Sequence, residues 1–358
     1  MNDLTNTLIS WYLINKRDLP WRNTTNPYHI WLSEIILQQT RVEQGMPYYY
    51  NFVEQYPDVE ALAQAPEDEV LKLWQGLGYY SRARNLHTTA KRISGEMDGK
   101  FPTTHKDLKD LKGVGDYTAS AIASICFNEA AAVVDGNVYR VLSRIFGIET
   151  PINSGTGQRE FKALAQELID DKNPALFNQA IMEFGAIQCK PKNPYCLHCP
   201  FNDRCIALKE NKIDSLPVKK GKVKVRDRYL NYLVFSINGQ FTLLQQRKGK
   251  GIWRGLYEFP LLESEKELNE TDFLAEARKK EFTEQNLEDY MQLLSAEEIT
   301  LYNPSPILHK LSHQNLYVKF WIISSEQTSI YENAIPIKNI QDYAVPRVID
   351  RFLESFDF

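Results

Sequence analysis

The chain has 358 residues, 43% of them hydrophobic and 25% charged, which is typical of a globular protein of about two domains. No apolar run approaches the roughly 20 residues needed to cross a bilayer, and the amino terminus lacks the features of a signal peptide, so we expect a cytoplasmic protein. The net charge of −4 does not favour nucleic-acid binding. Residues 219–228, however, carry six basic residues against one acidic residue, so the charge is compatible with a local basic surface.

The first informative segment is a predicted helix at residues 27–40. Its apolar residues, Leu32, Ile35 and Ile36, share one face at helical spacing. Glu34 lies at the flank of this face, where partial burial would raise the pKa of its carboxyl group and suit a general acid. Alternatively, Glu34 is a surface or capping residue.

Residues 73–84 combine two glycines, two tyrosines and two arginines. Glycine permits close backbone approach, aromatic rings stack on bases, and arginine binds phosphates, so the segment is a candidate DNA contact. The alternative is a structural loop held in the core by Trp74 and Leu77.

Residues 111–144 contain the turn Gly113-Val114-Gly115, which leads directly into a predicted helix. Unshielded amides and the positive end of a helix dipole favour an anion such as a DNA phosphate. An ordinary helix–helix turn is the alternative, but the surrounding leucine, alanine and isoleucine pattern completes a helix-hairpin-helix at about 108–125.

Four of the five cysteines fall within 17 residues, with the spacing C-x6-C-x2-C-x5-C: Cys189, Cys196, Cys199 and Cys205. In a cytoplasmic protein such clustering indicates a metal centre rather than disulfides. The residues alone allow zinc or an iron–sulfur cluster.

After a basic linker at 216–228, the sequence pattern changes from helical to strand-like. Two predicted strands, 229–237 and 241–247, flank the hairpin turn Asn238-Gly239. A further β-rich region at 316–323 and helices near 271–280 and 345–353 indicate an α+β domain at 229–358.

These motifs together resemble the MutY-type adenine DNA glycosylases of the helix-hairpin-helix, endonuclease III-like superfamily. The resemblance covers nearly the whole chain and is carried by LPWR at 19–22, SEIILQQTRV at 33–42, WQGLGYYSRARNLH at 74–87, LKGVGDYTA at 111–119, VDGNVYRV at 134–141 and the cysteine array. It implies a mainly α glycosylase domain at 1–215 with a [4Fe–4S] loop at 189–205, followed by a Nudix-like α+β domain.

The resemblance also implies roles for individual residues. Glu34 is the catalytic acid, Asp135 is the carboxylate beside the sugar, and Tyr117 and Asn137 position Asp135. One raised and one ordinary carboxyl pKa are therefore expected. The residues implied in DNA or substrate binding are Trp21, Arg22, Leu37 and Gln179 in the adenine pocket, Gln39 and Tyr79 in the duplex, Gly113, Val114 and Gly115 on the backbone, and Ser312 and His313 at the opposite base.

Tyr117 distinguishes two branches of the superfamily. The bifunctional endonuclease III-like enzymes carry a lysine at this position, whose amine forms a Schiff base and leads to strand cleavage. A phenol does not support that step, so Tyr117 favours base removal alone over a glycosylase-lyase acting on oxidised pyrimidines.

The Nudix-like domain is expected to recognise 8-oxoguanine rather than to hydrolyse nucleotides, because the carboxylate-rich pattern for Mg²⁺ does not follow Gly255. Leu311-Ser312-His313 stands where the family commonly has Phe-Ser-His. Leucine at the first position predicts weaker stacking than usual.

The expected function is excision of adenine opposite 8-oxoguanine, or opposite guanine, in duplex DNA during base excision repair. We expect a monomer that associates with the nucleoid through DNA and has no membrane partner. A non-catalytic damage-binding protein and, less favoured, a free-nucleotide hydrolase are the other classes; the presence of both carboxylates argues against the first.

Overall fold

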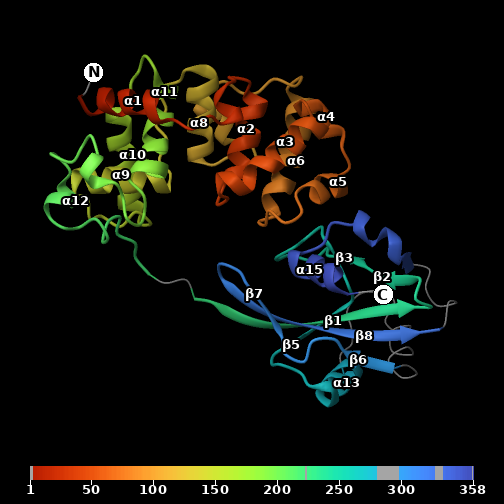
Figure 1. Ribbon diagram of the computed structural model, residues 1–358. Coiled ribbons are helices and arrows are strands. Elements are labelled where there is room, and N and C mark those ends of the chain that lie inside the picture. The colour runs from red at the N-terminus through yellow and green to blue at the C-terminus, as the bar shows by residue number, and fades with distance from the viewer. Residues whose placement is uncertain (1–2, 222–223, 280–297, 327–333, 357) are drawn as a thin grey trace. The chain divides into compact units, whose positions relative to one another are not determined.

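The computed structural model describes residues 3–221, 224–279, 298–326, 334–356 and 358 (Figure 1). The chain forms two compact units, Met1–Ala65 with Arg82–Gly221 and Pro66–Ser81 with Lys222–Phe358. The predicted basic linker at 216–228 contains the point at which the chain passes into the second unit. Among the described residues, no helix is both long and apolar enough to cross a bilayer.

The regular structure described in the first unit is helical. Its elements are α1 (Asp3–Asn15), η1 (Pro20–Arg22), α2 (Pro27–Leu37), α3 (Val42–Gln55), α4 (Val59–Gln64), α6 (Ser81–Glu96), α7 (His105–Lys109), α8 (Asp116–Phe127), α9 (Gly136–Phe146), α10 (Gly155–Leu168), α11 (Pro174–Glu183), η2 (Phe184–Gln188), η3 (Cys196–His198) and α12 (Ile206–Lys209).

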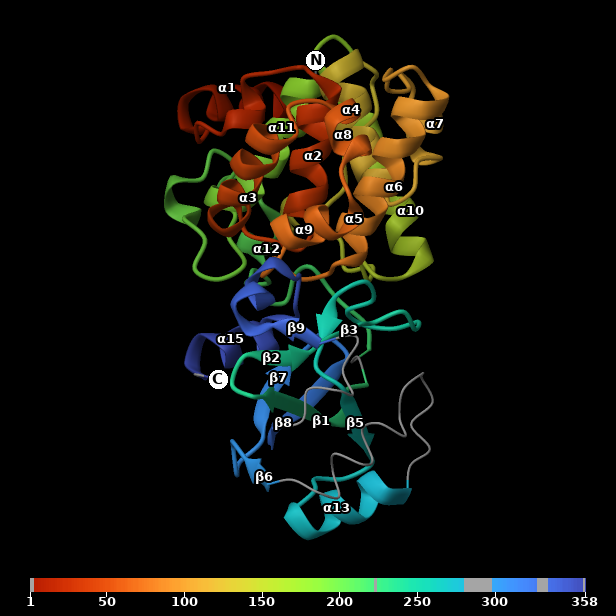
Figure 2. The ribbon, with the colours of Figure 1, turned by 90° about the vertical axis from the view of Figure 1, so that its right-hand side faces the viewer.

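Capping residues and prolines mark the starts of these helices, and the apolar faces of the helices pack against one another. Asn26 caps α2 by accepting a hydrogen bond from the Tyr28 amide at 2.9 Å, and Pro27 supplies the fixed φ suited to a first helical position. Figure 2 shows α2 in the middle of the unit, where it contacts α3 and α8. Fully buried side chains such as Leu8, Val141 and Phe161 form the core around α1, α9 and α10. This packing brings helices from distant parts of the chain against one another.

The second unit is α+β and includes α5 (Glu67–Leu73). Its main sheet has the order β6-β8-β1-β2-β9, with β5 also paired to β1 and β7 also paired to β8; β3 and β4 form a separate pair. The strands are β1 (Arg226–Ile237), β2 (Phe241–Leu243), β3 (Gln245–Gln246), β4 (Tyr257–Glu258), β5 (Leu261–Ser264), β6 (Glu298–Leu301), β7 (Ile307–Lys310), β8 (Gln314–Ser325) and β9 (Ala334–Pro336). β1 and β8 are parallel and the other pairs are antiparallel.

The predicted hairpin and helices of this unit are confirmed. Asn238 and Gly239 have φ values of 50° and 60°, as a tight turn between β1 and β2 requires. The predicted helix at 271–280 corresponds to α13 (Glu270–Lys279), with Lys280 outside the described residues, and the helix at 345–353 corresponds to α15 (Arg347–Ser355). Phe273 of α13 stacks on Trp321 with ring centroids 3.9 Å apart, which fixes the helix on the sheet.

Candidate active site

Glu34 lies on α2, partly buried between apolar neighbours. Burial raises the pKa of its carboxyl group to about 7, a hydrogen bond with Tyr117 lowers it, and the negative charge of Asp135 raises it further. Three residues far apart in the sequence therefore interact at one place. A carboxyl group that is half protonated near neutral pH can act as an acid.

Asp135 is the N-cap residue of α9. One carboxylate oxygen accepts hydrogen bonds from the amides of Asn137 and Val138, both at 2.8 Å, and the other accepts from the side-chain Nδ2 of Asn137 at 2.7 Å. Burial raises the pKa of Asp135, although these hydrogen bonds and Arg140 act in the opposite direction. The expectation of an ordinary pKa was therefore wrong, because it did not include the burial of the α9 start.

Tyr117 lies in the first turn of α8 and its hydroxyl interacts with the Glu34 carboxyl group and with Met182 Sδ, the latter at 3.3 Å. Burial and the two neighbouring carboxylates raise its pKa well above 10, so the phenol is neutral. Asn137 hydrogen bonds to Asp135, the contact that its predicted role requires. The Tyr117 hydroxyl instead hydrogen bonds to Glu34, and only the negative charge of Asp135 affects Tyr117.

A second polar group contains two of the residues predicted to form the adenine pocket. Arg22 donates to both carboxylate oxygens of Glu183, at 3.0 and 2.7 Å, and Arg17 donates to the same carboxylate at 2.9 and 2.7 Å. Gln179 Oε1 accepts a hydrogen bond from the Tyr12 hydroxyl at 2.6 Å. The Arg22 guanidinium lies 5.5 Å from the centre of the Tyr12 ring, so Arg22 and Gln179 share a neighbour.

The remaining two predicted pocket residues have apolar surroundings. Trp21 is buried in η1 and makes an edge contact with Tyr49, with ring centroids 5.2 Å apart. Leu37 ends α2 close to Gly45, where an added Cβ would lie 2.9 Å from the leucine Cδ2. The structure thus places Leu37 against α3.

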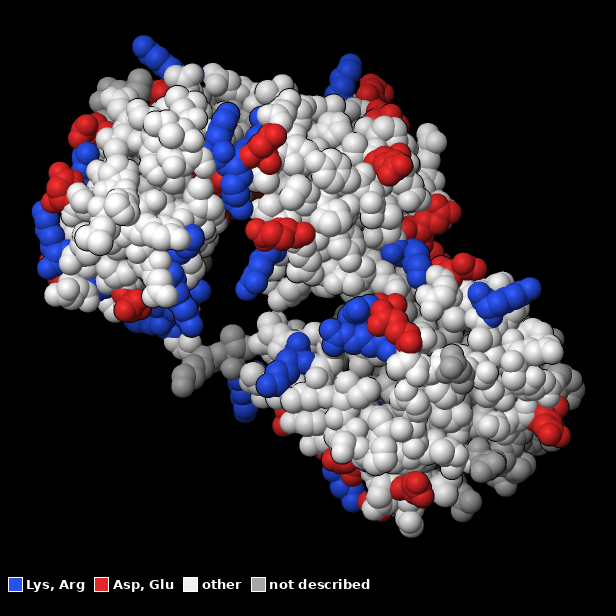
Figure 3. Space-filling view, in the orientation of Figure 1, with Lys and Arg blue, Asp and Glu red and all other residues white. Residues whose placement is uncertain are grey.

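The predicted helix-hairpin-helix is formed by α7, the turn at 111–115 and α8. Gly113 has φ +81°, and a Cβ there would lie 2.8 Å from the Asn85 Cβ, so both conformation and space require glycine. Gly113 and Gly115 are exposed, whereas Val114 is buried and its amide donates to the Leu111 carbonyl at 3.1 Å, which does not support the predicted phosphate contact of Val114. Asp116 opens α8 and forms ion pairs with Lys109 and Lys162 at 3.3 and 2.9 Å. On the face shown in Figure 3, basic and acidic side chains are interspersed, which agrees with the mixed composition.

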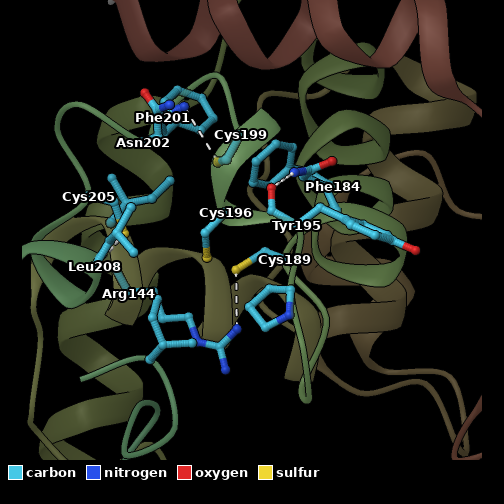
Figure 4. Close-up of a pocket in the computed structure, with 14 residues that line it drawn as sticks. Arg144, Phe184, Cys189, Tyr195, Cys196, Cys199, Phe201, Asn202, Cys205 and Leu208 are labelled. Carbon is cyan, nitrogen blue, oxygen red and sulfur yellow. Dashed lines mark hydrogen bonds between the residues drawn. The ribbon is translucent and has the colours of Figure 1, made fainter. Parts of the chain in front are cut away.

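The four clustered cysteines, Cys189, Cys196, Cys199 and Cys205, line one pocket (Figure 4). Two N–H groups point at sulfur: Arg144 Nη1 lies 3.5 Å from Cys189 Sγ, and the Phe201 amide lies 3.4 Å from Cys199 Sγ. Such donors stabilise negative charge on thiolates.

The comparisons with known proteins agree with this arrangement. Residues 32–169 match the HhH-GPD superfamily of base excision DNA repair proteins, and residues 232–355 match the NUDIX domain. The adenine DNA glycosylase of Buchnera aphidicola subsp. Schizaphis graminum is 32% identical over 98% of this chain and 97% of its own length. The mouse adenine DNA glycosylase is 33% identical over 89% of this chain and 70% of its own length. This chain belongs to the adenine DNA glycosylase family.

Solved structures with the same fold match the helical part. A thermostable thymine-DNA glycosylase is 31% identical, with a TM-score of 0.54 over 58% of this chain and 95% of its own. Endonuclease III in a non-covalent DNA complex is 20% identical, with a TM-score of 0.51 over 58% of this chain and 94% of its own. The predicted fold class and family are confirmed.

The donor set of this pocket is four thiol groups, a set that iron–sulfur clusters use. Within the described residues, no group of three or more His, Cys, Asp or Glu side chains is arranged to hold one metal ion. A [4Fe–4S] cluster is a wider body with one thiolate on each iron, so four thiols spread around one pocket fit it.

Arg140 connects this pocket to Asp135. Its guanidinium donates to the carbonyl oxygens of Cys189 and Gly185, both at 2.7 Å, and to Asn137 Oδ1 at 2.8 Å. Asn137 in turn holds Asp135. The position of Asp135 therefore depends on the chain that leads to the first cysteine.

Gln39 and Tyr79, the residues predicted to enter the duplex, share two properties. Both are exposed, and both have positive φ, 56° and 48°. Left-handed backbone is costly for non-glycine residues and is enriched at functional sites.

Ser312 and His313 lie in the turn of the hairpin formed by β7 and β8. The Leu311 amide donates to the Gln314 carbonyl at 2.8 Å and closes the turn, and both polar side chains are exposed. The Ser312 hydroxyl lies 3.1 Å from His313 Nδ1. These residues are accessible to a partner, as a base-recognition role requires.

Sequence reasoning missed Glu183, Arg17 and Arg140. Glu183 could have been found from its spacing, because it follows Gln179 by one helical turn and so lies on the same face of α11. Arg17 and Arg140 carried no comparable signal.

The Glu183→Gln variant is expected to unfold more readily at pH 7 by about 3 kcal/mol, since it leaves two arginines without their buried counter-charge. The arginines hold the pKa of Glu183 at about 2, below the ordinary 4.5. The stabilisation is therefore present above pH 4.5 and is lost as the pH falls towards 2. Thermal unfolding at pH 7 and pH 3.5 measures this.

In that experiment, the difference in thermal stability between wild type and Glu183→Gln should be smaller at pH 3.5 than at pH 7. Glu96→Gln is the control, because the Glu96–Arg92 pair is exposed and contributes less than about 1 kcal/mol. An equal difference in stability at both pH values would show that the ion pairs of Glu183 do not stabilise the fold.

Proposed function

We propose that this protein is a monofunctional DNA glycosylase that removes adenine opposite 8-oxoguanine, or opposite guanine, by hydrolysing the N-glycosidic bond in duplex DNA. The observation that carries the proposal is the convergence of Glu34, Tyr117 and Asp135. One carboxyl group titrates near pH 7 while the other accepts three hydrogen bonds that favour its charged form.

The chemistry follows the two-carboxylate logic of glycoside hydrolysis. Protonated Glu34 donates to N7 of adenine, which makes the base a better leaving group. Ionised Asp135 stabilises the positive charge that develops on the sugar, or bonds to it transiently, and water completes the reaction. The neutral Tyr117 phenol hydrogen bonds to Glu34 and supplies no amine for a Schiff base.

The other predicted residues bind the substrate in this proposal. The amides of Gly113 and Gly115 hold a backbone phosphate, because the Val114 amide already donates to the Leu111 carbonyl. Gln39 and Tyr79 fill the duplex when adenine is flipped out. Arg22 and Gln179 contribute to the adenine pocket with Glu183, and Ser312 and His313 contact the opposite base.

The four cysteines would hold a [4Fe–4S] cluster, which when bound cross-links the chain between residues 189 and 205. Hydrolysis of an N-glycoside transfers no electron, so we assign these cysteines a structural role. Through Arg140, their loop also supports the position of Asp135.

A single-turnover assay on a duplex with one labelled adenine opposite 8-oxoguanine tests the function, with and without alkali after the reaction. Strand breakage only after alkali is the expected result. Breakage without alkali would indicate a glycosylase-lyase, and intact binding without adenine release would indicate a damage-binding protein.

The single-turnover rate constant should fall as the pH rises through about 7. The carboxyl group acts as an acid only when protonated, and burial sets the pKa of Glu34 at about 7. Above that value the rate should fall about tenfold per pH unit. Rates measured between pH 6 and 9 give this profile, and a flat profile would remove Glu34 from the proton transfer.

A further inference from the structure

Arg82 is a buried arginine that takes no part in the proposed chemistry. It lies in the first turn of α6 and is 8% exposed. A buried guanidinium is costly unless it is well hydrogen bonded. Its Nη1 donates to the carbonyl oxygens of Ile35, Ile36 and Gln38 at 3.0, 2.7 and 2.6 Å. Its Nη2 donates to the Thr40 hydroxyl at 3.2 Å.

All four acceptors lie at the C-terminal end of α2 and in the loop that follows it. The last carbonyl groups of a helix have no partner within the helix and carry the negative end of its dipole. Arg82 therefore caps α2 from another part of the chain. Lysine could not reproduce this contact, because its ammonium group lacks the planar fork that reaches several acceptors at once.

The same loop contains Gln39, whose φ of 56° is unfavourable for a glutamine. Such a conformation persists only where neighbouring contacts enforce it. Arg82 holds the residues on both sides of Gln39, and Gln38 Nε2 also lies 3.3 Å from Thr118 Oγ1 of α8. Gln39 is thereby left exposed on a loop that is fixed at each end.

We propose that Arg82 is a positioning residue that presets the 38–40 loop, so that Gln39 enters the duplex as the adenine leaves it. The inference rests on the proposed function. Arg82 touches neither DNA nor the reacting atoms in the proposed mechanism and acts through Gln39.

A double-mutant cycle tests the proposal with Arg82→Lys, Gln39→Ala and the combined variant. Single-turnover adenine release from a duplex with adenine opposite 8-oxoguanine is measured for each. Arg82→Lys should slow release by about 100-fold, the effect of a displacement of roughly 1 Å at a positioned group. The combined variant should be no slower than Gln39→Ala. Multiplicative effects, or a wild-type rate for Arg82→Lys, would overturn the proposal.

Hydrogen exchange of the free protein gives a second readout that does not depend on catalysis. Arg82→Lys should speed amide exchange at residues 38–41 and leave α8 and α9 unchanged. If the wild-type protein releases no adenine but exchange changes only at 38–41, the proposed function fails while the preset loop stands. Unchanged exchange at 38–41 would overturn the preset loop itself.

The chain offers a matched control and a milder variant. Arg92 lies on the same helix and donates to the Asp110 carbonyl at 2.9 Å, but its side chain is 40% exposed, so Arg92→Lys should change neither readout. If Arg82→Lys does not fold, Thr40→Val leaves the Nη1 contacts in place and removes the Nη2 acceptor together with the 3.4 Å hydrogen bond from the Thr40 hydroxyl to the Gln38 carbonyl, so it should slow release in the same direction. A wild-type rate for Thr40→Val with unchanged exchange at 38–41 would then count against the proposal.

Discussion

Glu34→Gln should abolish adenine excision, with a loss of about 10²- to 10⁴-fold or more in the single-turnover rate constant. The amide has the shape of the protonated carboxyl group, but its N–H groups are not acidic enough to protonate adenine N7. DNA affinity should be unchanged, because the side chain keeps its size and its place beside Tyr117. Labelled duplex with adenine opposite 8-oxoguanine measures both quantities on the same sample.

The same variant should also be more stable than wild type above pH 7. Burial raises the folded-state pKa of Glu34 to about 7 from 4.5, so wild type loses stability as the pH rises through that range and the carboxylate becomes charged. Glutamine stays neutral. Thermal unfolding at pH 6 and pH 8 checks this, and retained turnover by the variant would remove the acid role whatever its stability.

Asp135→Asn is the second change expected to abolish excision. The neutral amide cannot stabilise a positive sugar, whereas asparagine is as good an N-cap as aspartate, so α9 should still begin at the same residue. Its side-chain oxygen can accept from the amides of Asn137 and Val138, as the carboxylate does now. The amide nitrogen cannot replace the second oxygen as acceptor for Asn137 Nδ2, so we expect a folded but somewhat less stable protein that binds DNA and shows no measurable adenine release.

Asp135→Ala is the contrasting variant. It removes both the charge and the cap, so it should also lower the free energy of unfolding by about 1 kcal/mol. Activity retained by Asp135→Asn but lost by Asp135→Ala would assign Asp135 to helix capping and contradict its catalytic role.

Patterns that act over short distances in the chain were predictable. The Gly113–Gly115 turn, the Asn238-Gly239 hairpin and the helix of Glu34 each depend on neighbouring residues, and the structure contains all three. The resemblance supplied the pairing of Glu34 with Asp135, which spacing alone did not contain.

What could not be predicted depends on contacts between distant segments. Glu183 meets Arg17 and Arg22 only because α11 packs against the start of the chain. The raised pKa of Asp135 likewise follows from how deeply the start of α9 is buried. A single sequence contains the residue types for these interactions but no measure of their proximity.

The five-residue turn η2 sets a constraint on chain length. It is a π-helical turn in which the Cys189 amide bonds to the Phe184 carbonyl, five residues back, at 2.8 Å. It therefore holds one residue more than an α-helical turn would. Deleting one residue here would rotate Cys189 by about 100° and shift it by about 1.5 Å relative to Glu183. Insertions and deletions should thus be selected against between these two residues.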